Sequence, residues 1–522
     1  MASSDTQYRS TRTGRAVGAP ARASAAVAQP GRGGFGRGPI ILLAVELLCL
    51  IILVLTWFFV LNSSDAYRLA QQGAASGVKR AETDAVIVAR TDNALGKSGA
   101  SSSSASSSAA SASARSASAS SASSSSAARN ASQSSFPSTK LAGASETVDD
   151  AGVVHGTSSG GVDYILYGRG QKSAEAGKIT LAAVGDVFAT TSNFPILDAY
   201  AGDVGDGEYD FLPYYRDVAD EITARDLRFI NQETPCAGID DGRDYSGYPV
   251  FNTPDSSVHA LAGVGFNIVN FNSNHTWDMD EYGIERTHGL FAEHPGLMVI
   301  GSYASDEDRS AVRLVERNGA TIAFLSYAYG DNSFGEDPGA FPNQYYTCQF
   351  DQDVMAQEIA RAKQVADAVV VYMHWGTEYT TEPNDQQLEY AQFLADQDVD
   401  LVIGSHAHIL QPIRYVTGAG GKQVPVVYGL SDFITGWTLT DTILSGMFTC
   451  DFTWSNGKLN VGNCSFTPAI EWSDGGDTTV RFLKDMTDEE IAENTRTEDV
   501  GDDVAYLHQF IDDLGMEVPV DW

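Results

Sequence analysis

KITLAAVGDVF, residues 178–188, is an apolar run that ends in Gly185-Asp186, and this pattern predicts a buried strand followed by a loop. Four later apolar runs also end in polar side chains: LRFI before NQE (231–233), FNIVNF before NSNH (272–275), VVVYM before HWG (374–376) and LVIG before SHAH (405–408). Helical segments, such as 255–264, alternate with these strands. We therefore predict an α/β domain with buried sheets over residues 178–480.

The polar residues after these five strands are candidates for one shared site. In open α/β sheets, ligands bind beyond the carboxyl ends of the strands, so these side chains are expected to lie together. Imidazole and carboxylate groups in combination are typical ligands of Zn, Mn or Fe. A set of this size can hold two such ions, which clamp the oxygens of a displacement and lower the pKa of bound water. The candidate residues are Asp186, Glu233, Asn274, His275, His374, His406 and His408.

Each motif also has a simpler interpretation when it is taken alone. Gly-Asp after a strand is usually a turn, and Asn231 and Glu233 can cap a turn that follows. A lone histidine such as His374 is more often structural than a ligand. His406 and His408, however, place both rings on one side only if the strand has bent, as at a metal site. The ordered set of five motifs at strand ends favours the metal site.

The motifs also resemble those of a known family when they are taken in order. GDVF, NQET, NSNHTWDMDEYG, HWGTEY, GSHAHILQ and YGLSDF are similar to the blocks GD, NLE, NNHxxDxG, HWGxEY, GHHPHxxQ and YSLGNF of the poly-gamma-glutamate capsule-synthesis (CapA) family. The resemblance covers about residues 178–440. That family is similar in turn to calcineurin-like metallophosphoesterases. The resemblance therefore implies a four-layer αββα sandwich, with two sheets between helices.

The same resemblance implies a role for each candidate residue. Asp186 and His408 would bind one metal, and Asn274, His374 and His406 would bind the second. Glu233 would bridge the two metals. His275 would not be a ligand but the acid that stabilises the leaving oxygen. Phe188 stands where phosphoesterases have the histidine of Asp-x-His, and the bridging carboxylate is the longer glutamate. Both departures are general in the family and put classical phosphomonoesterase activity in doubt. Asp432, in the last block, can add a carboxylate.

The segments outside the predicted domain indicate attachment to a membrane. Residues 39–61 form an apolar run long enough to span a bilayer, and the basic, disordered tail at 1–38 predicts a cytoplasmic N-terminus. A cleaved signal peptide is the alternative to this transmembrane helix. Residues 62–177, which include the Ser/Ala-rich run 99–135, predict a juxtamembrane segment and a disordered low-complexity stalk. Residues 481–522 are interpreted as an acidic, partly helical tail. The C-terminal domain is therefore expected to be extracytoplasmic.

The charge balance narrows the classes of partner. The chain has 68 acidic and 33 basic residues, a formal net charge of −35, which argues against nucleic acid as a partner. The leading hypothesis is a membrane-anchored protein with a di-metal hydrolase-type site and an implied role in poly-gamma-glutamate or capsule biosynthesis, export or tethering. The alternatives are a metallophosphoesterase acting on cell-wall or lipid-linked phosphate and a non-catalytic scaffold of a capsule synthase. The expected partners are an anionic polymer or phosphate-containing envelope substrate and membrane synthase subunits.

A hairpin is predicted near the end of the domain, with Asn456-Gly457 at its turn. If the loop has three residues, Ser455 faces Leu459 and Cys450 lies opposite Cys464, where a disulfide can form. A two-residue loop offsets the two cysteines and points them to opposite faces. We predict the disulfide, and two buried free thiols are the alternative.

Overall fold

Two sheets form the framework of the computed structural model, which describes residues 135–497 and 504–522. The first sheet has nine strands, in the spatial order β1 (Ser145–Val148), β2 (Val154–Thr157), β3 (Asp163–Tyr167), β8 (Val312–Arg317), β9 (Ala320–Ala328), β10 (Ala368–His374), β11 (Leu401–Ser405), β13 (Gln423–Val427) and β12 (Ile413–Thr417). At its centre β9, β10 and β11 are parallel neighbours. This sheet carries two of the five predicted site strands.

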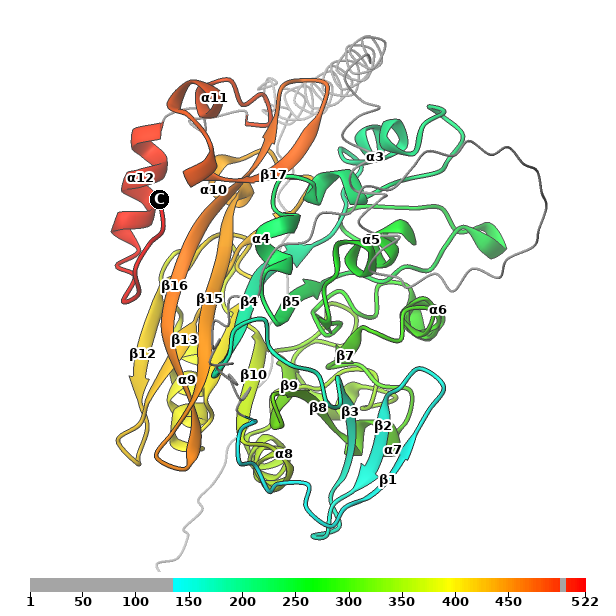
Figure 1. Cartoon of the computed structure of the whole chain (residues 1–522). Helices are drawn as coiled ribbons and strands as arrows, with labels where there is room; N and C mark the ends of the chain where they lie inside the picture. Colours follow the sequence, from blue (N-terminus) through cyan, green and yellow to red (C-terminus); the bar gives the residue numbers. More distant parts are fainter. Residues whose placement is uncertain (1–134, 498–503) are drawn as a thin grey trace, which may run out of the picture. The chain divides into compact units, whose positions relative to one another are not determined.

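The second sheet has eight strands, in the order β17 (Thr478–Phe482), β16 (Lys458–Ser473), β15 (Leu444–Ser455), β4 (Lys178–Val187), β5 (Leu227–Gln232), β6 (Ile268–Asn270) and β7 (Met298–Ile300), with β14 (Asp432–Ile434) paired to β4. Strands β4, β5, β6 and β7 are parallel, whereas β15 pairs with β4 in the antiparallel sense. Figure 1 shows the long strands β15 and β16 running alongside β4. The other three predicted site strands lie in this sheet.

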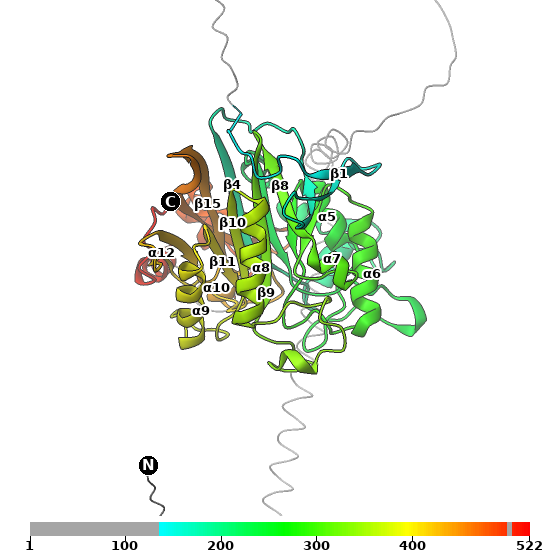
Figure 2. The same ribbon diagram turned by 90° about the horizontal axis from the view of Figure 1, so that it is seen from below.

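Helices cover the outer faces of both sheets. The longer ones are α3 (Phe194–Ala201), α5 (Ser256–Val264), α6 (Asp280–Ala292), α8 (Gln352–Val365), α9 (Asp385–Asp396) and α12 (Val504–Asp513), and the short ones are α4 (Ala219–Thr223), α7 (Asp306–Ser310), α10 (Thr440–Ile443) and α11 (Asp488–Ala492). Figure 2 shows α5 and α6 on one side of the strands and α9 on the other. This order of layers is the αββα sandwich that the family resemblance implies.

Successive side chains of each strand point to opposite faces of its sheet, and this alternation explains why three apolar layers form. Phe229 and Val370 point between the sheets and pack in one cluster, whereas their neighbours Ile230 and Val371 point outward, beneath the helices. All seven residues of β10 are buried. Parallel strands covered on both faces read as continuous apolar runs, which is the pattern found in the sequence. Replacing a buried ring such as Phe229 by alanine typically costs 3–5 kcal/mol, so this packing fixes the strand ends firmly.

The folded domain extends beyond both boundaries expected from the sequence. Strands β1, β2 and β3 lie within the segment interpreted as stalk, and β3 pairs with β8 of the large sheet. These strands have only four or five residues, every side chain of β1 is exposed, and β2 and β3 bury only Val154, Tyr164 and Leu166, so little marks them in the sequence. At the other end, Ile491, Leu507 and Ile511 of the supposed acidic tail are buried in the main core. The expected limits of 178 and 480 are therefore wrong.

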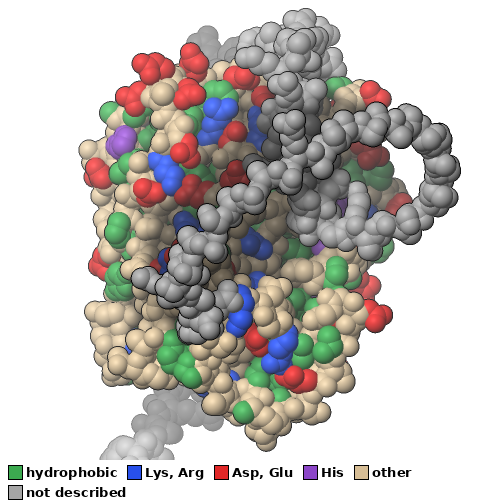
Figure 3. Space-filling model, in the orientation of Figure 1, with side chains coloured by type: hydrophobic (Ala, Val, Ile, Leu, Met, Phe, Trp, Pro, Cys, Tyr) green, Lys and Arg blue, Asp and Glu red, His purple; other side chains and the backbone are tan. Residues whose placement is uncertain are grey.

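The predicted transmembrane helix at 39–61, the tail before it and the Ser/Ala-rich run at 99–135 lie outside the described residues, apart from Ser135. Among the described residues, no helix is long and apolar enough to cross a membrane. On the face that Figure 3 shows, acidic side chains gather along the upper rim, and lysine and arginine side chains lie between them without forming one basic patch.

The predicted hairpin is present, but its turn is shorter than the disulfide prediction required. Strands β15 and β16 form the hairpin, and Ser455 pairs with Lys458, so the loop is the two residues Asn456-Gly457. A bulge then shifts the register between Thr449 and Asp451. Cys450 and Cys464 are both buried and are free thiols. The structure therefore has the alternative, two buried free thiols, in place of the predicted disulfide, although beyond the bulge Thr449 pairs with Ser465 in the register that the prediction required.

Candidate metal centre

The carboxyl ends of strands from both sheets meet at one place, and they bring the predicted site residues with them. Asp186 lies one residue before the end of β4, Glu233 directly follows β5, and Asn274 and His275 lie in the loop after β6. His374 ends β10, and His406 and His408 follow β11. The ring centres of His374 and His406 are 4.7 Å apart, and those of His406 and His408 are 6.0 Å apart. The geometry thus meets the expectation of one shared site.

Two overlapping groups of side chains have the spacing of metal ligands. Glu233, His406 and His408 form one group, and Asp186, His408 and Asp432 form the other, with ligand atoms within 4.8 Å of one another in each. His374 lies beside the first group, with Nε2 3.7 Å from Glu233 Oε1, and its Nε2 is 2.8 Å from Asn274 Oδ1. The assignment of each ligand to one or the other ion stays a prediction.

Several of these atoms lack the partners that buried polar atoms normally have. Both carboxylate oxygens of Glu233 and Nδ1 of His406 are buried and have no hydrogen-bond partner within the described residues. Nearly all buried polar groups in proteins are satisfied, because an unsatisfied one costs about 1–3 kcal/mol. Three such atoms in one group of candidate ligands fit a bound cation. The donor set, carboxylate with imidazole, suits a transition metal.

Electrostatics in the site also favour a cation. Burial, with repulsion from neighbouring carboxylates, raises the pKa of Asp186 to about 6 and that of Glu233 well above its usual range. Burial lowers the pKa of His374 and of His406 well below the ordinary value. Three carboxylates therefore share a dry site in which two imidazoles are held neutral. Neutral imidazole is the form that binds metal, and a divalent ion would stabilise the ionised carboxylates.

His408 is the exception among the site histidines. Burial alone would lower its pKa, but Asp432, Glu233 and Asp186 together raise it to about 10. Its Nδ1 lies 2.8 Å from Asp432 Oδ1. The sequence analysis noted Asp432 only as an additional carboxylate, yet it belongs to one of the two candidate groups. Asp432 is thus placed either to bind a metal or to orient His408.

The backbone around the site is held in uncommon conformations. His406, His408 and Ser431 have φ values of 109°, 57° and 62°, which residues other than glycine rarely adopt. Gly185 allows the Ser431 carbonyl to accept a hydrogen bond from Asp186 N at 3.0 Å, and a Cβ on Gly185 would lie 1.9 Å from that carbonyl oxygen. Strain of this kind persists only where the surrounding structure enforces it, and it clusters at functional sites.

A chain of buried amides supports Asp186 from behind. Asn231 Nδ2 donates to Asp186 Oδ1 at 2.6 Å, and Asn270 Nδ2 donates to Asn231 Oδ1 at the same distance. Ser326 Oγ then donates to Asn270 Oδ1, which joins the two sheets. Sequence reasoning missed Asn270 and Ser326, although Asn270 is an uncharged polar residue inside an apolar run, and that was the available signal. Such partners orient ligands and tune their basicity.

His275 belongs to neither metal group. Its Nδ1 lies 2.8 Å from Asp278 Oδ2, and Asp278 also accepts a hydrogen bond from Phe251 N at 2.7 Å. This His–Asp pair lies beside the metal groups and resembles an oriented acid rather than a ligand. Asp278 was not singled out from the sequence, although its spacing of three residues from His275 within NSNHTWDMDEYG was the signal.

A shallow aromatic pocket, open to solvent, lies beside the two groups. Its lining consists of Phe188, Glu233, Tyr248, Phe251, His275, Glu378, Tyr379, His408 and Trp437. Three of these, Glu233, His275 and His408, are predicted site residues. The pocket therefore gives a bound molecule access to the candidate metal centre.

Comparison with known proteins places this site in a family. Residues 180–436 match the model of the bacterial capsule synthesis protein PGA_cap. The PGA biosynthesis protein CapA of Bacillus subtilis (strain 168) is 32% identical over 190 residues, 36% of this chain and 48% of that protein. The capsule biosynthesis protein CapA of Bacillus anthracis is 27% identical over 278 residues, 52% of this chain and 63% of that protein. The chain thus spans about half to just under two thirds of these relatives.

Solved structures with similar folds are more distant. A putative 5'-nucleotidase from Staphylococcus aureus in complex with alpha-ketoglutarate is 16% identical, with a TM-score of 0.35 over 64% of this chain and 58% of that one. The calcineurin-like phosphoesterase YfkN from Bacillus subtilis is 13% identical, also with a TM-score of 0.35, over 65% of this chain and 99% of that one. The family model and the curated relatives identify the chain: through residues 180–436 it belongs to the bacterial capsule synthesis protein PGA_cap family.

Proposed function

We propose that this chain is a membrane-anchored, extracytoplasmic protein of poly-gamma-glutamate capsule biosynthesis, export or tethering, and that its domain is a di-metal hydrolase. The names of the relatives from Bacillus subtilis and Bacillus anthracis support the capsule role. The apolar run at 39–61, preceded by a basic tail, supports the anchor and its orientation. The proposed substrate is an anionic polymer or a phosphate-containing component of the cell envelope, and membrane synthase subunits are the proposed partners.

The observation that carries the hydrolase proposal is the set of unpartnered ligand atoms of Glu233 and His406. Two divalent ions of Mn, Zn or Fe, when bound, would lower the pKa of a water molecule and neutralise charge on the scissile group. Asp186, Glu233, His406, His408 and Asp432 would hold them, with Asn274 and His374 alongside. His275, oriented by Asp278, is placed to hold a proton at Nε2 for the leaving oxygen.

Two other functions are outcomes of the same test. A metallophosphoesterase acting on cell-wall or lipid-linked phosphate would use the same residues on a different substrate. A non-catalytic scaffold would need no metal. The retention of two complete groups of candidate ligands favours a working centre over a scaffold.

The test is metal analysis of the purified full-length chain, followed by hydrolysis assays with phosphoester and γ-glutamyl peptide substrates. We expect about two transition-metal ions per chain, and loss of metal in His406→Ala and Asp432→Asn. His259→Ala is the control, because this exposed histidine of α5 pairs with His294, just after α6, and belongs to neither metal group. Adding metal at about 100 times its dissociation constant should stabilise the metal-free protein by roughly 2.7 kcal/mol. A chain without bound metal or hydrolysis would instead support the scaffold.

A further inference from the structure

Four aromatic rings of the pocket form a closed cycle next to the metal centre. The rings are mutually tilted, with interplanar angles between 61° and 74°, and their centres are separated by 5.5 Å (Phe188 to Phe251), 6.5 Å (Phe251 to Tyr248), 6.1 Å (Tyr248 to Trp437) and 6.3 Å (Trp437 to Phe188). Tyr379 adds a fifth ring, 5.9 Å from His408. None of these five rings has a role in the proposed hydrolysis. We call them together the aromatic box.

The rings lead from solvent to the candidate metal centre. Phe188 and Phe251 are 1% and 2% exposed, and they contact the rings of His408 and His275. Tyr248 is 68% exposed and Tyr379 is 51% exposed, which is unusual for large aromatic side chains at the mouth of a pocket. A molecule held at the metal centre would therefore place its next group among these aromatic side chains.

The charge of the lining limits what that next group can be. No lysine or arginine lines the pocket among the described residues, and its charged members besides the histidines are Glu233 and Glu378. A second anionic group would enter a partly dry space beside two carboxylates, without a cation to pair with. The side chains of a free polyglutamate are therefore poor occupants of the aromatic box.

The polar groups that line the pocket, the indole N–H of Trp437 and the carboxylate of Glu378, discriminate between uncharged and cationic ligands. Trp437 Nε1 is buried and has no hydrogen-bond acceptor within the described residues. A quaternary ammonium offers no acceptor, whereas a hydroxyl group both accepts from the indole and donates to Glu378. Flat bases prefer stacked, parallel rings, and the rings here are tilted. A saturated ring with hydroxyl groups at its edge and C–H groups on its faces matches this lining.

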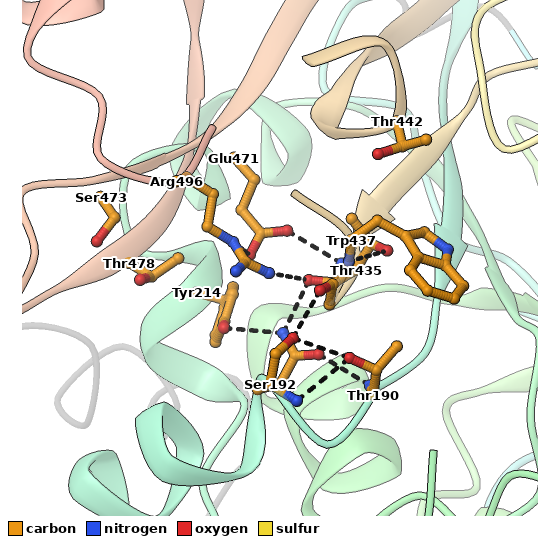
Figure 4. Close-up of polar contacts among 12 residues, drawn as sticks. Thr190, Ser192, Tyr214, Thr435, Trp437, Thr442, Glu471, Ser473, Thr478 and Arg496 are labelled. Atoms are coloured by element: carbon orange, nitrogen blue, oxygen red, sulfur yellow. Dashed lines mark hydrogen bonds and ion pairs between the residues drawn. The ribbon is translucent and has the colours of Figure 1, made fainter. Parts of the chain in front are cut away.

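A buried network holds Trp437 in place from the rear. Thr435 Oγ1 accepts a hydrogen bond from Trp437 N, and the Thr435 carbonyl accepts from Arg496 Nη2 at 2.7 Å and from Asn193 Nδ2 at 2.8 Å. Glu471 Oε2 accepts from Thr435 N at 3.0 Å. Figure 4 shows these contacts around Thr435, with the indole of Trp437 turned away from Glu471 and Arg496. The backbone that carries the indole is thus held in place before a ligand binds, as a specific binding site requires.

We propose that the aromatic box binds a sugar ring whose attached phosphate is held at the metal centre. This inference rests on the proposed function for the anion and deepens it, because it names a glycosyl phosphate as the substrate class. Trp437 and Tyr248 are the residues that determine this specificity, through ring contacts and, for Trp437, the indole N–H.

The test compares four probes by calorimetry on the metal-loaded full-length chain: N-acetylglucosamine 1-phosphate, inorganic phosphate, phosphocholine and γ-linked triglutamate. We expect the sugar phosphate to bind at least about 10-fold more tightly than inorganic phosphate. In Trp437→Ala and in Tyr248→Ala, the ratio of the affinity for the sugar phosphate to that for inorganic phosphate should fall to about one. The affinity for inorganic phosphate itself should not change. Trp437→Phe, which keeps a ring but loses the N–H, should lower the ratio roughly three-fold. Leu439→Ala, an exposed apolar residue outside the pocket lining, should leave the ratio unchanged.

Equal binding of sugar phosphate and inorganic phosphate would overturn the proposal, as would a larger advantage for phosphocholine or triglutamate. If the chain holds no metal and no phosphate, the proposed function fails. The box is then tested separately with free N-acetylglucosamine and tryptophan fluorescence. A response that Trp437→Phe abolishes would support the sugar site, and the absence of a response in the unaltered chain would overturn it.

Discussion

His275 and His406 lie in the same site, yet their contacts give them different chemistry. Nδ1 of His275 lies 2.8 Å from the Asp278 carboxylate, which orients the ring. Nδ1 of His406 is buried and has no partner within the described residues, and burial lowers the pKa of this ring. A ring oriented by a carboxylate suits an acid, and a neutral ring with an unshared lone pair suits a metal ligand.

This difference predicts opposite responses to substitution. His275→Ala should reduce hydrolysis by roughly 10²–10⁴-fold and leave the metal content nearly intact, because an acid acts only in the transition state. His406→Ala should lose metal. Asp278→Asn should reduce hydrolysis by about 10-fold, since it removes the partner that orients the acid. Metal analysis and rate measurements on the three variants check this, and equal metal loss in the His275 and His406 variants would show that the roles are wrongly divided.

Individual candidate ligands were predictable from the sequence because each lies at the end of an apolar strand or within three residues after it. Asp186, Glu233, His374, His406 and His408 all have this signal. Asn270 and Ser326 do not, because they act through a hydrogen bond between two sheets, and no local pattern reports which strands face each other. Asp432 was noticed only as a departure from a family block, because β14 is three residues long and its partner is β4.

Among the elements, the contact between β4 and β14 depends on one glycine. A Cβ at position 185 would lie 1.9 Å from Ser431 O and 2.9 Å from Leu430 O, and both are backbone atoms that cannot swing away. Gly185→Ala should therefore lower the free energy of unfolding by about 1–3 kcal/mol and displace Asp186, with loss of metal. Denaturant unfolding and metal analysis test this. Gly420→Ala is the control, because a Cβ there meets nothing within 4 Å, and similar losses in both variants would contradict the role of this contact.

Helix α6 carries a histidine that makes stability depend on pH. Burial lowers the pKa of His288 to about 4, and its Nε2 lies 2.8 Å from Ser302 Oγ. The ring stays neutral in the folded protein but takes a proton in the unfolded chain below about pH 6.5, so stability present above that pH is lost as the pH falls toward 4. In His288→Gln, the decrease in the free energy of unfolding between pH 7 and pH 4.5 should be about 1–2 kcal/mol smaller than in the unaltered chain. Urea unfolding at the two pH values measures this difference. An unchanged pH dependence in the variant would exclude His288 as the cause.

Element types were predictable where the burial pattern is strong. The five site strands, α5 and the hairpin all match the sequence expectation, because apolar runs and an Asn-Gly turn mark them. The short strands β1, β2 and β3 were missed because each has few buried residues and gains its stability from pairing with β8 or with one another. In the hairpin, the two-residue turn differs from the predicted three-residue loop, and a bulge then shifts the pairing to the predicted register from Thr449 and Ser465 onward.

For the whole molecule, a buried ion pair links the end of the chain to the site. Arg496 Nε donates to Glu471 Oε1 at 2.9 Å, and both side chains also hold Thr435, three residues after Asp432. Neither Arg496 nor Glu471 lies in the matched range of 180–436. Residues outside the family blocks thus hold part of the site in place, which motif reading alone could not reveal.

Substituting one member of this ion pair should lower the free energy of unfolding more than substituting both members. Arg496→Met leaves the buried Glu471 without its cation and should destabilise the chain by roughly 3–5 kcal/mol. The double variant Glu471→Met/Arg496→Met should be less destabilised than that single variant, because two apolar side chains leave no buried charge. Urea unfolding of the single and double variants gives the comparison. A double variant that loses the sum of the two single effects would argue against a direct coupling.

The pairing of β15 with β4 also bears on how the protein can be shortened or recombined. Residues 178–183 of β4 pair with residues 448–453 of β15 in an antiparallel ladder, and these β15 residues lie beyond the last family block. A chain cut at residue 436 would keep every predicted metal ligand but expose the long edge of β4, with unpaired backbone groups that can recruit the same strand of another copy. The recognisable motif and the smallest soluble unit are therefore different stretches of chain. A fusion that transfers this domain to another protein should therefore include the hairpin of β15 and β16, because without it we expect the product to aggregate.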